Sequence, residues 1–151
     1  MDELRELYQA TILDHNKSPR NFGELTDAKR SARGDNPICG DKLAVYLDLD
    51  DDDRVVDIRF DGKGCAISTA SASLMTEFVK GRRREEINET FERFHTLVTG
   101  NPSETVDAPE LGKLAVFSGV REYPVRVKCA TLCWHTLRAA LSHSGEIART
   151  E

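Results

Sequence analysis

The sequence predicts an α+β fold in which helices pack on one side of a small antiparallel sheet of about three strands. Two observations support this class. Apolar and polar residues alternate in two short segments between residues 43 and 60, as in half-buried strands, and apolar residues at helical spacing lie before and after them. A chain of 151 residues can bury one core without disulfide bonds, so we expect one domain over residues 1–151.

The composition is typical of a soluble protein, with 39% hydrophobic and 31% charged residues. No apolar run reaches membrane-spanning length, and the acidic start Met1–Glu6 has no secretory signal. We therefore expect a cytoplasmic protein whose thiols stay reduced. The net charge of −5 argues against a nucleic-acid partner.

One helix and a hairpin are expected first. The helix runs to about Asp14 and is broken by Ser18–Gly23, which opens a long polar connection. Alternation over Leu43–Leu49 and again over Val56–Phe60 predicts two strands, each with one apolar face. Between them, Asp50–Asp53 lacks the interleaved glycine and distal glutamate of a calcium loop, so we interpret it as a solvated turn.

Several helices are expected after the hairpin. The second strand ends at Gly62–Cys65, and the small residues that follow predict a tightly packed helix that ends at Gly81. Apolar positions from Ile87 to Val98 predict the next helix. An exposed loop over Gly100–Gly112 and a short helical segment around Leu114–Phe117 complete this region.

Four cysteines stand at positions 39, 65, 129 and 133, and no pair has the Cys-x-x-Cys spacing of a zinc ribbon or redox motif. Disulfides are not expected in a reducing compartment, and free cysteines often behave as small buried hydrophobes. The sequence around each cysteine must therefore distinguish a core residue from a metal ligand.

The loop Asn36–Asp41 places a thiol and a carboxylate two residues apart. Pro37 stiffens this loop and Gly40 allows a tight turn, so Cys39 and Asp41 can point at one metal ion. The pair alone is a weak signal, because Asp41 could equally cap a turn.

Cys65 and Cys129 each lie near the start of an expected helix. The helix N-terminus favours the thiolate, and the cations Arg126 and Lys128 do the same for Cys129. Cys65 alone could instead be a structural cysteine in a crowded turn. If the three segments converge on one side of the sheet, three thiolates and Asp41 provide four ligands that suit tetrahedral zinc.

The last helix follows Tyr123–Pro124 and contains Cys133. This residue lies one turn beyond Cys129 and could reach the same metal, but we expect it in the core because it belongs to the apolar stripe of the helix. The stripe comprises Ala130, Cys133, Trp134, Leu137 and Leu141.

The remaining polar features are interpreted as surface groups. Four histidines are scattered along the chain, and a surface or capping role is expected for each rather than metal ligation. They are His15, His95, His135 and His143. Arg82–Arg84 followed by Glu85–Glu86 is typical of a solvated helix start, with partner docking as the alternative.

Taken together, these segments resemble the SufU family, relatives of the IscU scaffold proteins of iron–sulfur cluster assembly. The resemblance rests on Leu7–Ile12, Asp14–His15, Pro19–Asn21, Asn36–Asp41, Gly64–Ser68 and Val127–Leu132 with Trp134. IscU-type scaffolds carry histidine directly before the third cysteine, where this chain has Lys128, and the long stretch between Cys65 and Cys129 is similar to that of SufU proteins. Cys133 departs from the family, which usually has a small or apolar residue there.

The resemblance implies a SufE/IscU-like fold and a zinc-dependent sulfurtransferase. It implies zinc on Cys39, Asp41, Cys65 and Cys129, with Cys39 accepting persulfide sulfur from a SufS-type cysteine desulfurase, a pyridoxal-phosphate enzyme. The sulfur would then pass to a downstream iron–sulfur scaffold. Arg126 is expected to steer the complex or to stabilise the leaving thiolate. Two alternatives stay open: a scaffold that builds a [2Fe–2S] cluster on the same cysteines, and a structural zinc protein.

Overall fold

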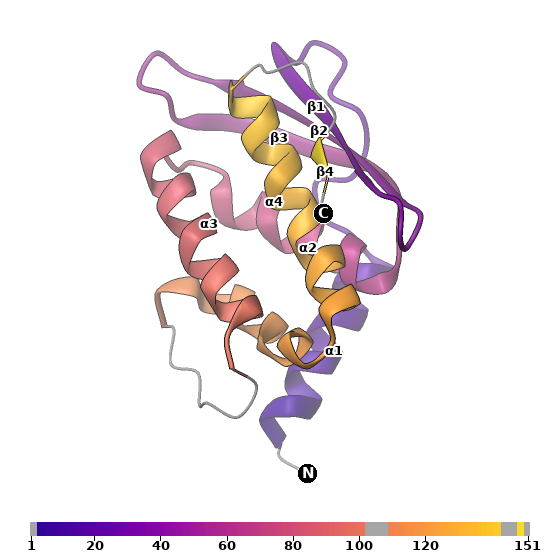
Figure 1. Cartoon of the computed structure of the whole chain (residues 1–151). Coiled ribbons are helices and arrows are strands. Elements are labelled where there is room, and N and C mark those ends of the chain that lie inside the picture. Colours follow the sequence, from indigo (N-terminus) through magenta and orange to yellow (C-terminus); the bar gives the residue numbers. More distant parts are fainter. Residues whose placement is uncertain (1–2, 102–108, 143–147, 150–151) are drawn as a thin grey trace.

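The computed structural model describes residues 3–101, 109–142 and 148–149. Its elements in chain order are α1 (Glu3–Lys17), β1 (Arg30–Asn36), β2 (Asp41–Leu49), β3 (Val55–Lys63), α2 (Ala66–Val79), α3 (Arg84–Thr99), the 3-10 segment η1 (Pro109–Glu122), α4 (Pro124–Ser142) and β4 (Ala148–Arg149). The strands form a four-stranded sheet in the order β3-β2-β1-β4. Figure 1 shows the helices gathered on one side of this sheet, which confirms the predicted α+β class.

The β2–β3 hairpin forms as predicted, with an antiparallel register that pairs Val45 with Phe60. The turn between the strands is exposed, and its geometry comes from one carboxylate: Asp50 Oδ1 accepts the backbone N–H groups of Asp52 and Arg54, each at 2.9 Å. The acidic run is therefore a solvated turn, as the sequence indicated.

The expectation that Val56 faces the core is wrong. Val55 is buried, whereas Val56 is 51% exposed. The register shifts between Asp48 and Leu49, so one extra residue of β3 lies opposite this step. A β-bulge of this kind reverses the alternation of faces at the start of the strand, and the regular pattern resumes at Ile58.

β1 is an unexpected strand inside the predicted polar connection. It pairs antiparallel with β2 from Arg30, opposite Leu47, to Asn36, opposite Asp41, and it pairs parallel with the short β4. Its buried Gly34 lies directly under α4: a Cβ at this position would come within 1.9 Å of Thr136 Oγ1. Gly34 therefore allows α4 to pack closely on the sheet.

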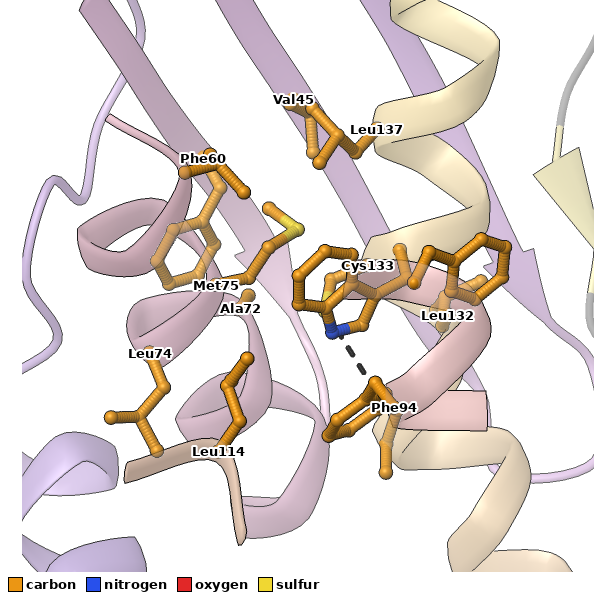
Figure 2. Packing of buried hydrophobic residues seen from close by; sticks show 14 of the residues in the cluster. Val45, Phe60, Ala72, Leu74, Met75, Phe94, Leu114, Leu132, Cys133 and Leu137 are labelled. Carbon is orange, nitrogen blue, oxygen red and sulfur yellow. Dashed lines mark hydrogen bonds between the residues drawn. The ribbon is translucent and has the colours of Figure 1, made fainter. Parts of the chain in front are cut away.

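The core lies between the sheet and helices α2 and α4. The apolar stripe predicted for α4 is fully buried, from Ala130 to Leu141. Figure 2 shows Cys133 of α4 among buried side chains of the core that include Met75 of α2 and Phe94 of α3. None of the helices in the described part of the chain has both the length and the apolar character needed to cross a membrane.

Most helix ends agree with the sequence. α2 is followed by Gly81 at φ 85°, and α3 begins at Arg84, where Glu86 accepts the backbone N–H of Arg83 at 3.2 Å. The arginine-rich segment is thus a helix start, as interpreted. Two boundaries differ: α1 continues to Lys17, and η1 begins at Pro109, within the predicted loop. Residues 102–108 of that loop lie outside the described residues.

The expected surface role of His15 is wrong. Its side chain is buried in the packing of α1 on α2, where Nδ1 lies 2.7 Å from Ser73 Oγ. Ser73 Oγ also accepts the backbone N–H of Arg20 at 2.8 Å. His95 is exposed, as expected, whereas His135 is half-buried against the Phe91 ring. His143 lies outside the described residues.

Candidate metal centre

One tight connection, the loop between β1 and β2, positions the first two candidate ligands. β1 and β2 pair up to Asn36 and Asp41, so the residues between them form a hairpin loop. Gly40 adopts φ 74°, and its N–H donates to the carbonyl of Asn36 at 2.8 Å. This turn places Cys39 on the exposed loop and Asp41 at the buried start of β2.

The structure brings Cys39, Asp41 and Cys129 together. One ligand atom from each lies within 4.8 Å of the other two, and the Cys129 and Cys39 Sγ atoms are 3.3 Å apart. Cys129 is buried in α4, so this cluster joins the loop to the helix. Two sulfur ligands on one tetrahedral zinc ion are roughly 3.8 Å apart, given Zn–S bonds of ~2.3 Å. The three side chains are therefore close to the spacing that a metal ion needs.

Cys65 lies beside this cluster, next to Cys129 and Asp41, but it is not one of the three side chains whose ligand atoms all lie within 4.8 Å of one another. It is the N-cap of α2, where its Sγ accepts the backbone N–H of Ser68 at 3.4 Å. Its own N–H donates to Asp41 Oδ1 at 2.9 Å. The strand-to-helix turn predicted from the sequence thus holds Cys65 next to Asp41.

The neighbouring thiols of Cys65 and Cys129 differ in their pKa values. The hydrogen bond from Cys129 lowers the pKa of Cys65 to about 6; the Ser68 N–H acts in the same direction, and burial opposes them. The same hydrogen bond, followed by burial, raises the pKa of Cys129 well above its usual range. Cys65 is therefore the thiolate of this pair at neutral pH, and its charge adds to that of the Asp41 carboxylate.

Gly64 allows the turn before α2 to approach Asp41. A Cβ at Gly64 would lie 3.0 Å from Ser68 Oγ and 3.1 Å from Asp41 Oδ1. Both distances are shorter than an ordinary van der Waals contact, so a side chain here would displace Asp41 or Ser68. Gly64 thus allows a close approach of the backbone to Asp41, a candidate ligand.

The charges at this centre favour a bound cation. Asp41 is 0% exposed, and it forms no ion pair with a lysine or arginine among the described residues. A buried carboxylate beside a thiolate is costly without a positive partner. A set of thiolates and one carboxylate suits zinc, so the residues present fit this ion.

Cys133 lies in the core rather than in the cluster. It is 0% exposed, and its Sγ contacts Ser71 Oγ at 3.4 Å and the Ala130 carbonyl at 3.8 Å. Burial raises the pKa of Cys133 to about 12. The thiol is therefore protonated at neutral pH, which agrees with its place in the apolar stripe.

Arg126 is exposed near the start of α4, three residues before Cys129. Its guanidinium lies over the Tyr123 ring, 4.4 Å from the ring centroid. Three large apolar side chains are also exposed close in sequence to the cysteines: Ile38 (59%), Tyr123 (42%) and Val125 (48%). Apolar and cationic side chains are therefore exposed close in sequence to the candidate ligands.

Two polar side chains next to the candidate ligands were not predicted from the sequence. Asn36 is 0% exposed, and its Nδ2 lies 3.4 Å from Asp41 Oδ2 and 3.7 Å from Cys129 Sγ. Ser68 is also 0% exposed and lies near Gly64. The only signal in the sequence was that both residues fall within the short segments that contain a ligand.

Comparison with known proteins identifies a family and several relatives of this chain. Residues 7–130 match the NifU-like N-terminal domain family. The zinc-dependent sulfurtransferase SufU of Bacillus subtilis is 40% identical over 139 residues, which cover 92% of either chain. The iron–sulfur cluster assembly scaffold protein IscU of Streptococcus pyogenes serotype M1 is 38% identical over 146 residues, which cover 95% of this chain and 88% of the relative.

A solved structure of FiSufU from Fervidobacterium islandicum AW-1 has the same fold. It is described as a candidate scaffold protein for iron–sulfur cluster assembly in the SUF system. Its TM-score is 0.81 at 35% sequence identity, and the match covers 91% of this chain and 98% of that one. The chain therefore belongs to the NifU-like N-terminal domain family, together with these SufU and IscU relatives.

Proposed function

We propose that this protein is a zinc-dependent sulfurtransferase of iron–sulfur cluster assembly that accepts persulfide sulfur on Cys39. The observation that carries the proposal is the position of Cys39: an exposed thiol on a turn, 3.3 Å from the buried Cys129 Sγ and within the cluster that contains Asp41. The 40% identity to a zinc-dependent sulfurtransferase supports the same activity.

Cys39 is the cysteine best placed to receive sulfur. It lies in a short loop between two strands, so its side chain can move without disrupting a helix. Cys65 caps α2, and Cys129 is 2% exposed within α4. Displacing either of them would cost a helix cap or core packing.

The transfer is an exchange at sulfur that needs no external oxidant or reductant. The Cys39 thiolate attacks the terminal sulfur of the donor persulfide, R–S–SH. A bond forms between Cys39 Sγ and that sulfur, and the S–S bond of the donor breaks. The products are Cys39–S–SH and the thiolate R–S⁻, so the proton stays on the transferred sulfur.

Zinc would be held by Cys39, Asp41, Cys65 and Cys129, and when bound it keeps these thiols deprotonated at neutral pH. The other contributions come from the chain itself. Asp41 receives the N–H groups of Cys65 and of Asn36 and so fixes the start of α2 against β2.

Arg126 is proposed to stabilise the leaving thiolate of the donor. It is exposed and carries a permanent positive charge, and its stacking on Tyr123 limits the positions of the guanidinium. It is therefore an exposed cation three residues before Cys129 on α4, and Cys129 lies against Cys39.

The sulfur donor is proposed to be a SufS-type cysteine desulfurase, and the final recipient an iron–sulfur scaffold in the cytoplasm. The exposed apolar residues Ile38, Tyr123 and Val125 support a protein partner at this end of the molecule, because such residues are frequent in binding surfaces. The experiment is to measure desulfurase turnover with cysteine. Addition of this protein should accelerate turnover, whereas Cys39→Ala should not.

A scaffold that assembles a [2Fe–2S] cluster on the same side chains is the second candidate, because the 38% identical relative is named as a scaffold. Metal analysis separates the two functions. The sulfurtransferase is expected to be purified colourless, with close to one zinc per chain. A brown protein containing iron and sulfide in equal amounts would instead support the scaffold.

A further inference from the structure

We propose that Asn36 is a positioning residue that lowers the reactivity of Cys129 and thereby directs sulfur to Cys39; this inference rests on the proposed function. Asn36 is the last residue of β1 and is 0% exposed. The antiparallel register pairs it with Asp41, and its carbonyl accepts the Gly40 N–H at 2.8 Å. Its backbone is therefore fixed by the turn that carries Cys39.

The amide of Asn36 is directed at two candidate ligands. Nδ2 lies 3.4 Å from Asp41 Oδ2 and 3.7 Å from Cys129 Sγ, and its two N–H groups can serve both acceptors. The reversed amide would place Oδ1 against a carboxylate oxygen and a sulfur, both of which are acceptors. The orientation with Nδ2 toward the ligands is therefore the favourable one.

The carbonyl oxygen of the same amide has no hydrogen-bond partner within the described part of the chain. The side-chain hydrogen bonds of Asn36 in this part of the protein are thus both made to residues of the metal centre. A buried amide used to stabilise the fold would be expected to bond through both of its ends. This asymmetry indicates that Asn36 serves the cluster.

The three cysteines consequently differ in the N–H donors that reach them. Cys65 receives the Ser68 backbone N–H at 3.4 Å, and Cys129 receives the Asn36 amide. Among the described residues, Cys39 receives no hydrogen bond from an N–H group, and its Sγ lies 3.3 Å from Cys129 Sγ. An N–H donor withdraws electron density from a thiolate and makes it a weaker nucleophile. Cys39 is therefore the most nucleophilic thiolate of the three once the thiol protons are lost.

The test replaces Asn36 and measures how sulfur is distributed. Asn36→Leu keeps the approximate volume and removes both donors; Asn36→Ala is the second variant if the first does not fold. Thr136→Val is the matched control, because Thr136 is a buried polar residue of α4 that faces Gly34 of β1, and its hydroxyl donates to the Leu132 carbonyl at 2.8 Å. Zinc-loaded proteins are treated with a limiting amount of glutathione persulfide, and the persulfide is mapped by mass spectrometry.

The wild type and Thr136→Val should carry persulfide chiefly on Cys39, whereas in the Asn36 variants the ratio of Cys129 to Cys39 persulfide should rise at least threefold. A second readout does not depend on sulfur transfer. In cobalt-substituted protein, loss of the N–H donor should move the thiolate-to-cobalt charge-transfer band to longer wavelength, and Thr136→Val should not move it.

An unchanged cobalt band or an unchanged persulfide ratio in an Asn36 variant that retains metal would overturn the role of Asn36. A wild-type protein that carries no persulfide on Cys39 would instead overturn the proposed function. The cobalt spectrum would still show in that case whether Asn36 donates to Cys129.

Discussion

The backbone N–H of Cys65 donates to Asp41 Oδ1 at 2.9 Å, which joins the residue that caps α2 to the residue that begins β2. Asp41 thus has two roles at once, as a candidate ligand and as the acceptor that holds a helix start against the sheet. Because its carboxylate is buried without a cationic side chain among the described residues, we expect metal binding and the stability of the fold to be linked.

Removal of the metal should therefore destabilise the protein. Purified protein is expected to contain close to one zinc per chain, and treatment with a strong chelator should lower the Tm because Asp41 loses its positive partner. The measurement is thermal unfolding with chelator and after zinc is added back. An unchanged Tm after complete removal of zinc would contradict the linkage.

Gly64→Ala should weaken zinc binding by roughly 10-fold or more, the scale observed for disturbed neighbours of metal ligands. The added Cβ would lie 3.1 Å from Asp41 Oδ1 and force the carboxylate to shift. Gly119→Ala is the matched control, because a Cβ there meets no atom within 4 Å. Competition with a chromophoric chelator gives both affinities. Equal affinities for the two variants would show that the contact at Gly64 is unimportant.

Cys133→Ala should keep zinc and lose about 1 kcal/mol of stability, as for small truncations in a core. The thiol is buried in the apolar stripe of α4 and bonds Ser71 and the Ala130 carbonyl. Urea unfolding and metal analysis of the same sample measure both quantities, with Cys129→Ala as the variant that should lose zinc. Loss of zinc from Cys133→Ala would make Cys133 a ligand.

Burial of His15 should make stability depend on pH. Burial, and then the nearby Arg20, lower the pKa of His15 in the folded protein, whereas in the unfolded chain it stays near ~6.5. As the pH falls below about 6.5, His15 therefore takes up a proton in the unfolded chain before it does so in the folded protein. The free energy of unfolding decreases until the pH reaches the folded-state pKa of His15.

His15→Asn should remove this part of the pH dependence, because asparagine can accept a hydrogen bond from Ser73 but does not titrate. The measurement is the difference in free energy of unfolding between wild type and variant from pH 5 to pH 8. That difference should change with pH, the wild type losing more stability at low pH. A difference that is constant with pH would contradict a lowered pKa of His15 in the folded protein.

The sequence predicted the local features of the site well. Glycines and small residues around Cys65 indicated the strand-to-helix turn, and the stripe around Cys133 separated this core cysteine from the three candidate ligands. These features depend on neighbouring residues in the chain, so a single sequence contains them. The fold class followed from the same patterns.

Other features depend on contacts that a single sequence does not reveal. β1 is polar, and it is a strand because it pairs with β2 along its length, from Arg30 to Asn36. Asn36 and Cys129 are 93 positions apart, and only the packing of α4 on the sheet brings them together. The bulge opposite Asp48 and the burial of His15 arise in the same way from tertiary structure.

The proposed function requires that Cys39 accepts the sulfur. Loss of activity in a single cysteine variant does not identify the acceptor, because Cys39, Cys65 and Cys129 are all proposed to hold the metal. The location of the added sulfur does identify it. The zinc-loaded protein should therefore be incubated with a SufS-type desulfurase and cysteine, alkylated without reduction, and digested for mass spectrometry.

We expect a mass increase of one sulfur atom on the peptide that contains Cys39, within the time of a single desulfurase turnover. Cys133 should remain unmodified, since its thiol is buried and protonated. The result that would contradict the account is persulfide found chiefly on Cys65 or Cys129 while Cys39 stays unmodified.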